Sequence, residues 1–297
     1  MKKVFITGSN GFVGKNLIRA LIKEGIAYTA GDRSTYGDIV SQANWSSILS
    51  DCDVVVHLAA RVHVMEETEA DPLIAFRKMN VEATLNLAKA ARESGVKRFI
   101  YISSVKVNGE ETHENPFSAN DVPAPLDPYG VSKMEAEREL MKMHTPGVFE
   151  IVIIRPPLVY GPGVKANFEK LFWLVKKDLP IPFGRVKNKR SLVSVYNLCD
   201  LIIRCMDHPN ASGETFLVSD DKDYSLKDLI IQMAKTEGKF PHLLPVPVSM
   251  MKMAATMLGK KSYANRLFGN LHVDITKTKS LLNWQPPYTF EETFKSQ

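Results

Sequence analysis

The sequence contains no apolar run that approaches the roughly 20 residues needed to cross a bilayer, and its first residues lack the pattern of a signal peptide. Cysteine is scarce, and Cys52, Cys199 and Cys205 form an odd number without metal-ligand spacing. The net charge of +5, from 38 basic and 33 acidic residues, is too small and too dispersed to indicate nucleic-acid binding. These absences predict a cytoplasmic protein with reduced thiols and with no metal, no nucleic-acid partner and no membrane anchor.

A glycine-rich turn follows the first apolar segment of the chain. Residues 3–7 predict a buried strand and residues 16–24 an amphipathic helix, and the turn between them reads Gly8-Ser9-Asn10-Gly11-Phe12-Val13-Gly14. A turn of this kind presents bare N–H groups and the positive end of a helix dipole to a phosphate. Two residues separate the first two glycines, whereas the commoner fingerprint has one. The context nevertheless predicts a cradle for a dinucleotide.

The second predicted strand, residues 27–31, ends at Asp32 and Arg33. An acidic side chain about 20 residues beyond such a cradle binds the adenosine ribose hydroxyls and disfavours a 2′-phosphate. Arg33 favours the opposite choice, because a guanidinium there can accept the extra phosphate. We therefore expect NAD, with NADP as the alternative.

A tyrosine and a lysine lie one turn apart at the start of another predicted helix. Asp127 is a good N-cap and Pro128 suits the first helical position, which places Tyr129 and Lys133 at i and i+4 on one face. A nearby positive charge favours the phenolate, so we expect Lys133 to lower the pKa of Tyr129 toward neutrality. By itself, this pair is equally well explained as an ordinary surface feature.

A third segment, residues 98–104, reads as a strand that ends in Ser103 and Ser104. In a parallel sheet, the carboxyl ends of the strands form the edge where ligands bind. Ser104 is therefore expected to face the same cavity as Tyr129, although by itself it is equally well explained as a serine that only starts a turn.

Together, the cradle, Ser104 and the Tyr129–Lys133 pair resemble the extended short-chain dehydrogenase/reductase superfamily, in particular its nucleotide-sugar 4-epimerases. The resemblance covers essentially the whole chain. It implies an α/β fold with a doubly wound parallel sheet and a smaller C-terminal substrate-binding lobe. We expect residues 1–164 to form the cofactor domain, with 191–218 returning to it, and residues 165–297 to form mainly the substrate lobe. A homodimer is also implied.

The resemblance also implies contacts that spacing alone does not predict. Asp38 and Ile39 match residues that contact the adenine in the family, and residues 57–60 match the end of a family strand. Asn80 lies in a helix motif of the family. Residues 155–163 match a segment that closes over the nicotinamide. The predicted cofactor site is Gly8, Asn10, Gly11, Phe12, Val13, Gly14, Asp32, Arg33, Asp38, Ile39, Leu58, Ala59, Ala60, Asn80 and Pro156.

The predicted substrate-binding residues are Lys106, Asn167 and Arg190. Asn167 matches a family position near the substrate diphosphate, and Arg190 begins a segment whose arginine grips phosphate. A solvated loop residue is the other interpretation of Arg190. Val105 and Lys106 stand where related dehydratases carry an Asp and a Glu that catalyse water loss, which argues against a dehydratase.

The resemblance implies that Tyr129, acidified by Lys133 and by the charge of the nicotinamide, removes a proton from a sugar hydroxyl to which Ser104 hydrogen-bonds. We expect a C4 epimerase of a UDP-hexose or UDP-N-acetylhexosamine that works through a transient 4-keto sugar. The first alternative is a 4-ketoreductase of a UDP-linked 6-deoxy-4-keto-N-acetylhexosamine that consumes NAD(P)H. The second is a dinucleotide-binding regulator without catalysis.

The apolar segment 247–258 is followed by Lys260 and Lys261. These features suggest a helix on a membrane surface. Because the segment is short and rich in methionine, we instead expect a helix that packs on the substrate lobe, as a lid.

Overall fold

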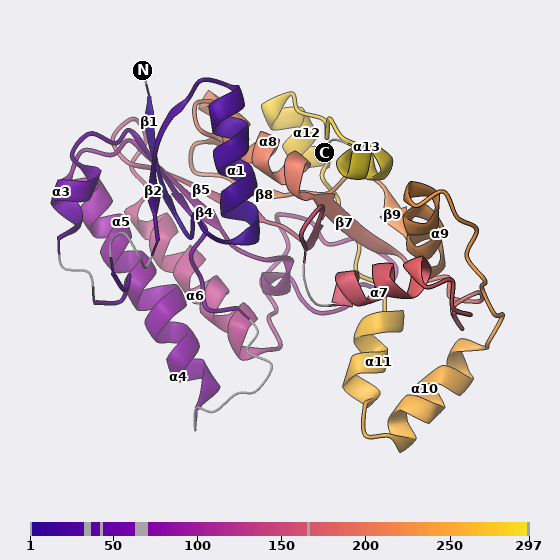
Figure 1. Ribbon diagram of the computed structural model, residues 1–297. Helices are drawn as coiled ribbons and strands as arrows, with labels where there is room; N and C mark the ends of the chain where they lie inside the picture. The colour runs from indigo at the N-terminus through magenta and orange to yellow at the C-terminus, as the bar shows by residue number, and fades with distance from the viewer. Residues whose placement is uncertain (1, 33–36, 42–43, 63–70, 165–166, 296–297) are drawn as a thin grey trace.

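The computed structural model describes residues 2–32, 37–41, 44–62, 71–164 and 167–295. Within these residues, the central feature is a sheet of six parallel strands in the order β2-β1-β3-β4-β5-β8 (Figure 1). The strands are β1 (Lys3–Thr7), β2 (Ala27–Gly31), β3 (Val54–His57), β4 (Arg98–Ile102), β5 (Glu150–Arg155) and β8 (Thr215–Leu217). The strand order reverses after β1, so the cradle lies at a switch point of the sheet.

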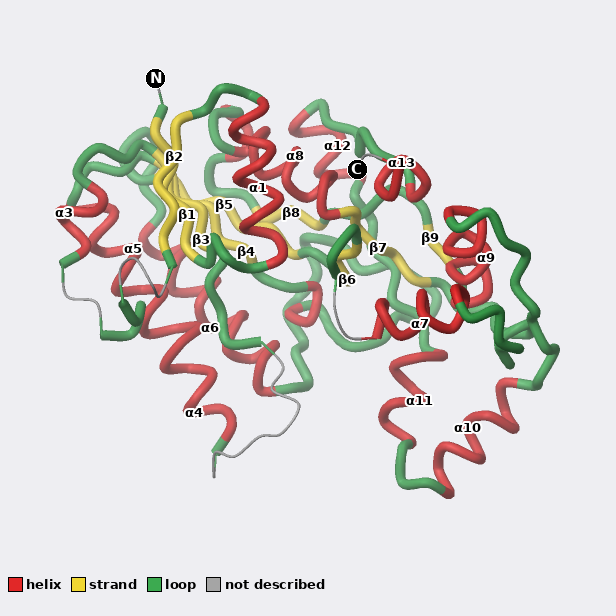
Figure 2. The backbone as a smooth tube through the Cα atoms, in the orientation of Figure 1, coloured by secondary structure: helices red, strands yellow, loops and turns green. Residues whose placement is uncertain are grey.

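Helices cover both faces of this sheet (Figure 2). They are α1 (Phe12–Lys23), α3 (Trp45–Leu49), α4 (Pro72–Arg77), α5 (Ala83–Glu93), α6 (Pro128–Met143) and α8 (Val195–Cys205). Successive side chains of β1 point to opposite faces of the sheet. Val4 and Ile6 pack with α1 and α8 on one face, and Phe5 packs with α3 and α5 on the other. The predicted doubly wound parallel fold is confirmed.

The start of α1 differs from the sequence-based prediction. The helix begins at Phe12 rather than at Asn16, with Gly11 as its N-cap. The glycine turn therefore runs directly into the first helical turn, which brings the helix N-terminus to the cradle. Another irregularity is the π-helical turn η1 (Lys78–Glu82), which joins α4 to α5 and carries Asn80.

A second, smaller sheet has the order β6-β7-β9. Its strands are β6 (Leu158–Tyr160), β7 (Arg190–Ser194) and β9 (Asp223–Tyr224), and a separate apolar core lies around Tyr160, Ile230 and Phe290. The remaining elements are η2 (Val105–Val107), α7 (Asn167–Lys176), η3 (Pro209–Ala211), α9 (Leu226–Thr236), α10 (Val248–Met257), α11 (Lys261–Phe268), α12 (Thr276–Leu282) and α13 (Phe290–Lys295).

No helix among the residues that the structure describes is both long and apolar enough to span a membrane. Within the same residues, no group of three His, Cys, Asp or Glu side chains is placed to hold a metal ion. Cys52, Cys199 and Cys205 are buried free thiols.

Candidate active site

The glycine turn after β1 has the geometry of a phosphate cradle. Gly8 has a φ of +68°, which favours glycine, and a Cβ at Gly8 would lie 2.9 Å from the Ala59 backbone nitrogen. A Cβ at Gly14 would lie only 2.3 Å from the Gly8 carbonyl oxygen. Side chains at these two positions would thus push the turn away from both the sheet and α1. With glycine there, the N-terminus of α1 opens onto the pocket described next.

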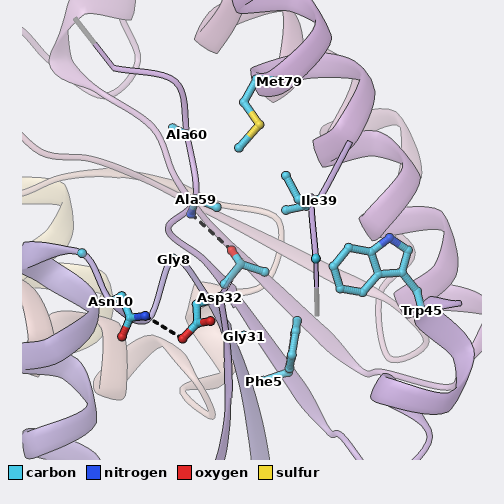
Figure 3. Close-up of a pocket in the computed structure, with 13 residues that line it drawn as sticks. Phe5, Gly8, Asn10, Gly31, Asp32, Ile39, Trp45, Ala59, Ala60 and Met79 are labelled. Carbon is cyan, nitrogen blue, oxygen red and sulfur yellow. Dashed lines mark hydrogen bonds between the residues drawn. The ribbon is translucent and has the colours of Figure 1, made fainter. Parts of the chain in front are cut away.

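A pocket of about 570 Å³ lies over the carboxyl ends of β1, β2 and β3 (Figure 3). It is lined by Phe5, Thr7, Gly8, Asn10, Gly11, Gly31, Asp32, Gly37, Ile39, Trp45, Ala59, Ala60 and Met79. Seven predicted cofactor residues are among them: Gly8, Asn10, Gly11, Asp32, Ile39, Ala59 and Ala60. The glycine cradle, Asp32 and the small side chains of Ala59 and Ala60 fit the adenosine diphosphate part of a dinucleotide, whereas Ser104, Tyr129 and Lys133 are not among the lining residues.

The two ends of this pocket differ in polarity. At the cradle end, the Asn10 side-chain amide donates to an Asp32 carboxylate oxygen over 2.7 Å, and the Ala59 N–H donates to the Thr7 hydroxyl over 3.2 Å (Figure 3). At the other end, Ile39, Trp45 and Met79 form an apolar wall that suits a flat base. Trp45 and Met79 were not predicted. The only sequence signal for Trp45 is a large aromatic residue at the start of a short helix.

Other predicted cofactor residues lie outside this lining. Phe12, Val13 and Gly14 belong to the first turn of α1, and Leu58 follows β3. The exposed Asp38 carboxylate accepts from the Val40 N–H over 3.0 Å. Arg33 lies outside the described residues.

Asn80 and Pro156 both connect segments of the site. The buried Asn80 amide exchanges two hydrogen bonds with the Arg61 backbone and donates to the Ser132 hydroxyl over 3.0 Å. It thus fastens the chain after Ala60 to α6. The carbonyl of Pro156 accepts from the Val105 N–H over 3.0 Å, which fixes the turn that carries Ser104.

Ser104, Tyr129 and Lys133 come together where β4 meets the start of α6. Ser104 is the N-cap of η2, where its hydroxyl accepts from the Lys106 N–H over 3.3 Å, and it lies close enough to the Tyr129 phenol to lower the pKa of that group. Asp127 caps α6 as predicted, because its carboxylate accepts from the Gly130 N–H over 2.7 Å. The Nζ atom of Lys133 donates to the Ile102 carbonyl over 2.9 Å and lies 5.9 Å from the centroid of the Tyr129 ring.

The pKa of Tyr129 differs from the expectation. Burial raises the pKa of Tyr129 to about 12, and the hydrogen bond from Ser104 only partly offsets that rise. Burial also lowers the pKa of Lys133 to about 7, so this lysine carries only part of its charge near neutrality. The prediction that Lys133 lowers the phenol pKa is therefore wrong for the protein alone, because desolvation of the ring and the nearby Asp127 carboxylate raise this pKa, and the partial offset comes from Ser104 rather than from Lys133.

The three predicted substrate-binding residues lie in three different elements of the structure. The Lys106 ammonium pairs with both Asp127 and Glu110, so it links the serine turn to the cap of α6. Burial acts to raise the pKa of Asp127, but hydrogen bonds from Lys106 and the Gly130 N–H lower it. Arg190 opens β7, and its Nη1 donates to the carbonyls of Arg266 and Gly269 over 2.7 and 3.3 Å. Asn167 opens α7, and its side chain lies outside the described part of the structure.

Comparisons with known proteins agree with this architecture. The model of the NAD dependent epimerase/dehydratase family matches residues 4–219. A UDP-glucose 4-epimerase from Vibrio cholerae is 47% identical over 307 residues, which cover 99% of this chain and 94% of the relative.

Solved structures show the same fold. A UDP-glucose 4-epimerase from Thermotoga maritima with UDP-glucose superposes with a TM-score of 0.77 at 22% identity, covering 98% of this chain and 96% of that one. A UDP-glucuronic acid 4-epimerase from Bacillus cereus in complex with NAD gives 0.75 at 23% identity, covering 98% and 95%. At these identities, the likeness establishes the fold alone.

Proposed function

The chain belongs to the NAD dependent epimerase/dehydratase family, and we propose that it is a nucleotide-sugar C4 epimerase. Its substrate is a UDP-hexose or UDP-N-acetylhexosamine, and the reaction passes through a transient 4-keto sugar. The observation that carries the proposal is that Ser104, Tyr129 and Lys133 meet beyond the end of β4, the strand next to β3, whose following residues Ala59 and Ala60 line the cofactor pocket. The name of the Vibrio cholerae relative supports the same reaction class.

NAD is the cofactor that the pocket fits. The cradle of Gly8, Gly11 and Gly14 would hold its diphosphate, Asp32 the adenosine ribose, and Ile39 and Trp45 the adenine. NAD bound there would supply hydride transfer from the sugar C4 and back to its opposite face. Asp32 favours NAD over NADP, because its carboxylate would repel a 2′-phosphate at the ribose.

The protein contributes proton transfer and orientation. Tyr129 accepts the proton of the sugar 4-hydroxyl and later gives it back, while Ser104 hydrogen-bonds the same oxygen. Since the protein alone holds the phenol pKa at about 12, phenolate formation requires positive charge added beside the ring. An oxidised nicotinamide carries such a charge. Lys133 is anchored to the Ile102 carbonyl and contributes its positive charge in the protonated state.

The substrate diphosphate has to stay fixed while the keto sugar turns over. We propose that Arg190 holds it, since both backbone contacts of its guanidinium come from Nη1 and leave Nε and Nη2 to donate to phosphate. Asn167 would add a further contact. Lys106 is held on the serine turn by Asp127 and Glu110, and we propose that it contacts the substrate from there.

We propose that residues 1–164 form the cofactor domain and residues 165–297 mainly the substrate lobe. The return of residues 191–218 to the cofactor domain is supported by α8, which packs against α1, and by β8, which extends the large sheet. We also propose a cytoplasmic homodimer that has no nucleic-acid partner.

The test is to incubate the purified protein with UDP-glucose and, separately, with UDP-N-acetylglucosamine, and to separate the C4 epimers by chromatography. Epimerisation without added coenzyme, together with NAD released on denaturation, is the expected result. Consumption of NADPH with a 4-keto sugar, from protein that retains no nucleotide, would instead establish the ketoreductase. If Tyr129→Phe leaves the cellular function unchanged, the protein is a binding module rather than an enzyme.

A further inference from the structure

The helix pair α10–α11 carries an apolar surface that the rest of the described chain does not cover. The two helices pack mainly on each other and extend from the smaller lobe as a hairpin (Figure 1). No residue of α10 is fully buried. The exposed fractions are 55% for Met250, 62% for Met253, 82% for Met257, 73% for Leu258 and 52% for Tyr263.

α10 is apolar on two opposite faces. Val248 and Met251 pack toward the core of the smaller lobe, so the helix already uses one apolar stripe to attach to the protein. Met250, Met253 and Met257 follow the i, i+3, i+7 spacing of a second stripe, which faces solvent. A helix needs only one apolar stripe to dock on its own protein. The second stripe is therefore available to contact an apolar surface outside the protein's own core.

The charge around this stripe has a single sign. Residues 238–273 contain no Asp and no Glu, although acidic residues are common in the rest of the chain. The same segment contains Lys239, Lys252, Lys260, Lys261 and Arg266. Lys252 lies on α10, and Lys260 and Lys261 lie at the tip of the hairpin next to Leu258, all three of them exposed.

From this combination we infer that the α10–α11 hairpin docks on an anionic membrane surface. Exposed methionine and leucine side chains enter the boundary between headgroups and acyl chains, while the lysines contact anionic headgroups. Neither signal is strong alone, because the helix is short and the charges are few. Together they give reversible peripheral binding that places the smaller lobe next to the bilayer.

Sedimentation with vesicles tests this inference on the full chain. The protein is mixed with vesicles of phosphatidylglycerol and phosphatidylcholine, and separately with vesicles of phosphatidylcholine alone. We expect binding to the anionic vesicles and little to the neutral ones. Raising the salt from about 0.1 M to about 1 M should weaken the binding, because the Debye length falls from about 10 Å to about 3 Å.

Two variants separate the apolar signal from the charge. Lys260→Glu/Lys261→Glu should weaken partitioning by at least about 25-fold, because each lost lysine costs about fivefold near an anionic surface and each new glutamate adds repulsion. Met253→Ser/Met257→Ser/Leu258→Ser should abolish binding at either salt concentration. The matched controls are Lys23→Glu/Lys89→Glu, with the same charge change, and Ile22→Ser/Val148→Ser, with exposed apolar residues elsewhere. Both controls should bind as the unchanged protein does.

Circular dichroism melting checks that every variant folds, and epimerase activity without vesicles should be unchanged by the hairpin substitutions. The inference fails if the unchanged protein does not bind anionic vesicles, or if the controls lose as much binding as the hairpin variants. It also fails if the hairpin substitutions convert a dimer to a monomer while vesicle binding is absent. In that case, the surface is an interface between copies of this chain.

Discussion

Arg155 and Glu137 form a buried ion pair that ties the end of β5 to the middle of α6. The Arg155 Nε and Nη2 atoms donate to the Glu137 carboxylate over 3.0 and 2.6 Å, and both side chains are only 6% exposed. Nη1 also donates to the Asn108 side-chain oxygen over 3.0 Å. Because Glu137 lies one turn beyond Lys133, the pair sets the position of the helix that carries the proposed catalytic residues.

Removing one partner of this pair should destabilise the protein strongly. We expect Glu137→Ala to lower the free energy of unfolding by about 3–5 kcal/mol, because it leaves an uncompensated buried guanidinium. Glu139 on the same helix is only partly buried and pairs with Lys142 at the surface, so it offers a control, and Glu139→Ala should change the value by no more than about 1 kcal/mol. Urea denaturation measures both. Similar losses in the two variants would show that the buried pair contributes no more than a surface charge.

Tyr129→Phe should abolish epimerisation while the protein still folds and retains its nucleotide. Loss of a positioned acid–base group lowers kcat by about 10²- to 10⁴-fold. Tyr196 lies on α8, outside the proposed site, so Tyr196→Phe serves as a control that should keep full activity. Steady-state kinetics with each UDP-sugar measures kcat and KM separately. A Tyr129→Phe variant with normal kcat would exclude the phenol as the proton acceptor.

Burial of Lys133 should make stability depend on pH in a definite direction. Its folded pKa of about 7 lies below its ordinary value, so the unfolded chain binds more protons between these values and stability rises with pH. Lys133→Met removes this dependence. Relative to that variant, the unchanged protein should gain on the order of 3 kcal/mol between about pH 7 and about pH 10, and little below pH 7. Denaturation curves at several pH values measure the difference, and parallel pH profiles would show that the lysine titrates normally.

Most of the parallel framework and much of the cofactor pocket were predictable from sequence. Residues 3–7 and 27–31 form strands at the predicted bounds, because both are β-prone segments with a clear boundary. Trp45 and Met79 were missed because they reach the pocket from segments without a motif. The rise of the Tyr129 pKa was missed for another reason. Desolvation depends on what covers the ring, and local sequence does not contain that information.

Gly14→Ala should disrupt the cradle more than Gly11→Ala does. The added Cβ would lie 2.3 Å from the Gly8 carbonyl oxygen at position 14, but 3.1 Å from it at position 11. We expect Gly14→Ala to destabilise the protein by about 1–3 kcal/mol through overpacking and to lose bound nucleotide. Thermal melting and the absorbance of released nucleotide measure the two effects. Equal retention of nucleotide in both variants would show that the close approach at Gly14 is not required.

Asp32 should decide the choice between NAD and NADP. Its carboxylate lies at the end of β2 and accepts from the Asn10 amide over 2.7 Å, which directs it into the pocket. Asp32→Asn keeps a hydrogen-bonding side chain but removes the charge that repels a 2′-phosphate. We expect NAD affinity to fall by about tenfold, the equivalent of one charge-assisted hydrogen bond, and the preference over NADP to shrink further. Titration calorimetry with each dinucleotide on nucleotide-free protein measures the ratio of the affinities for NAD and NADP.

The exposed Asp38 provides the control, since Asp38→Asn should leave that ratio unchanged. If Asp32→Asn also leaves it unchanged, another part of the site selects the cofactor.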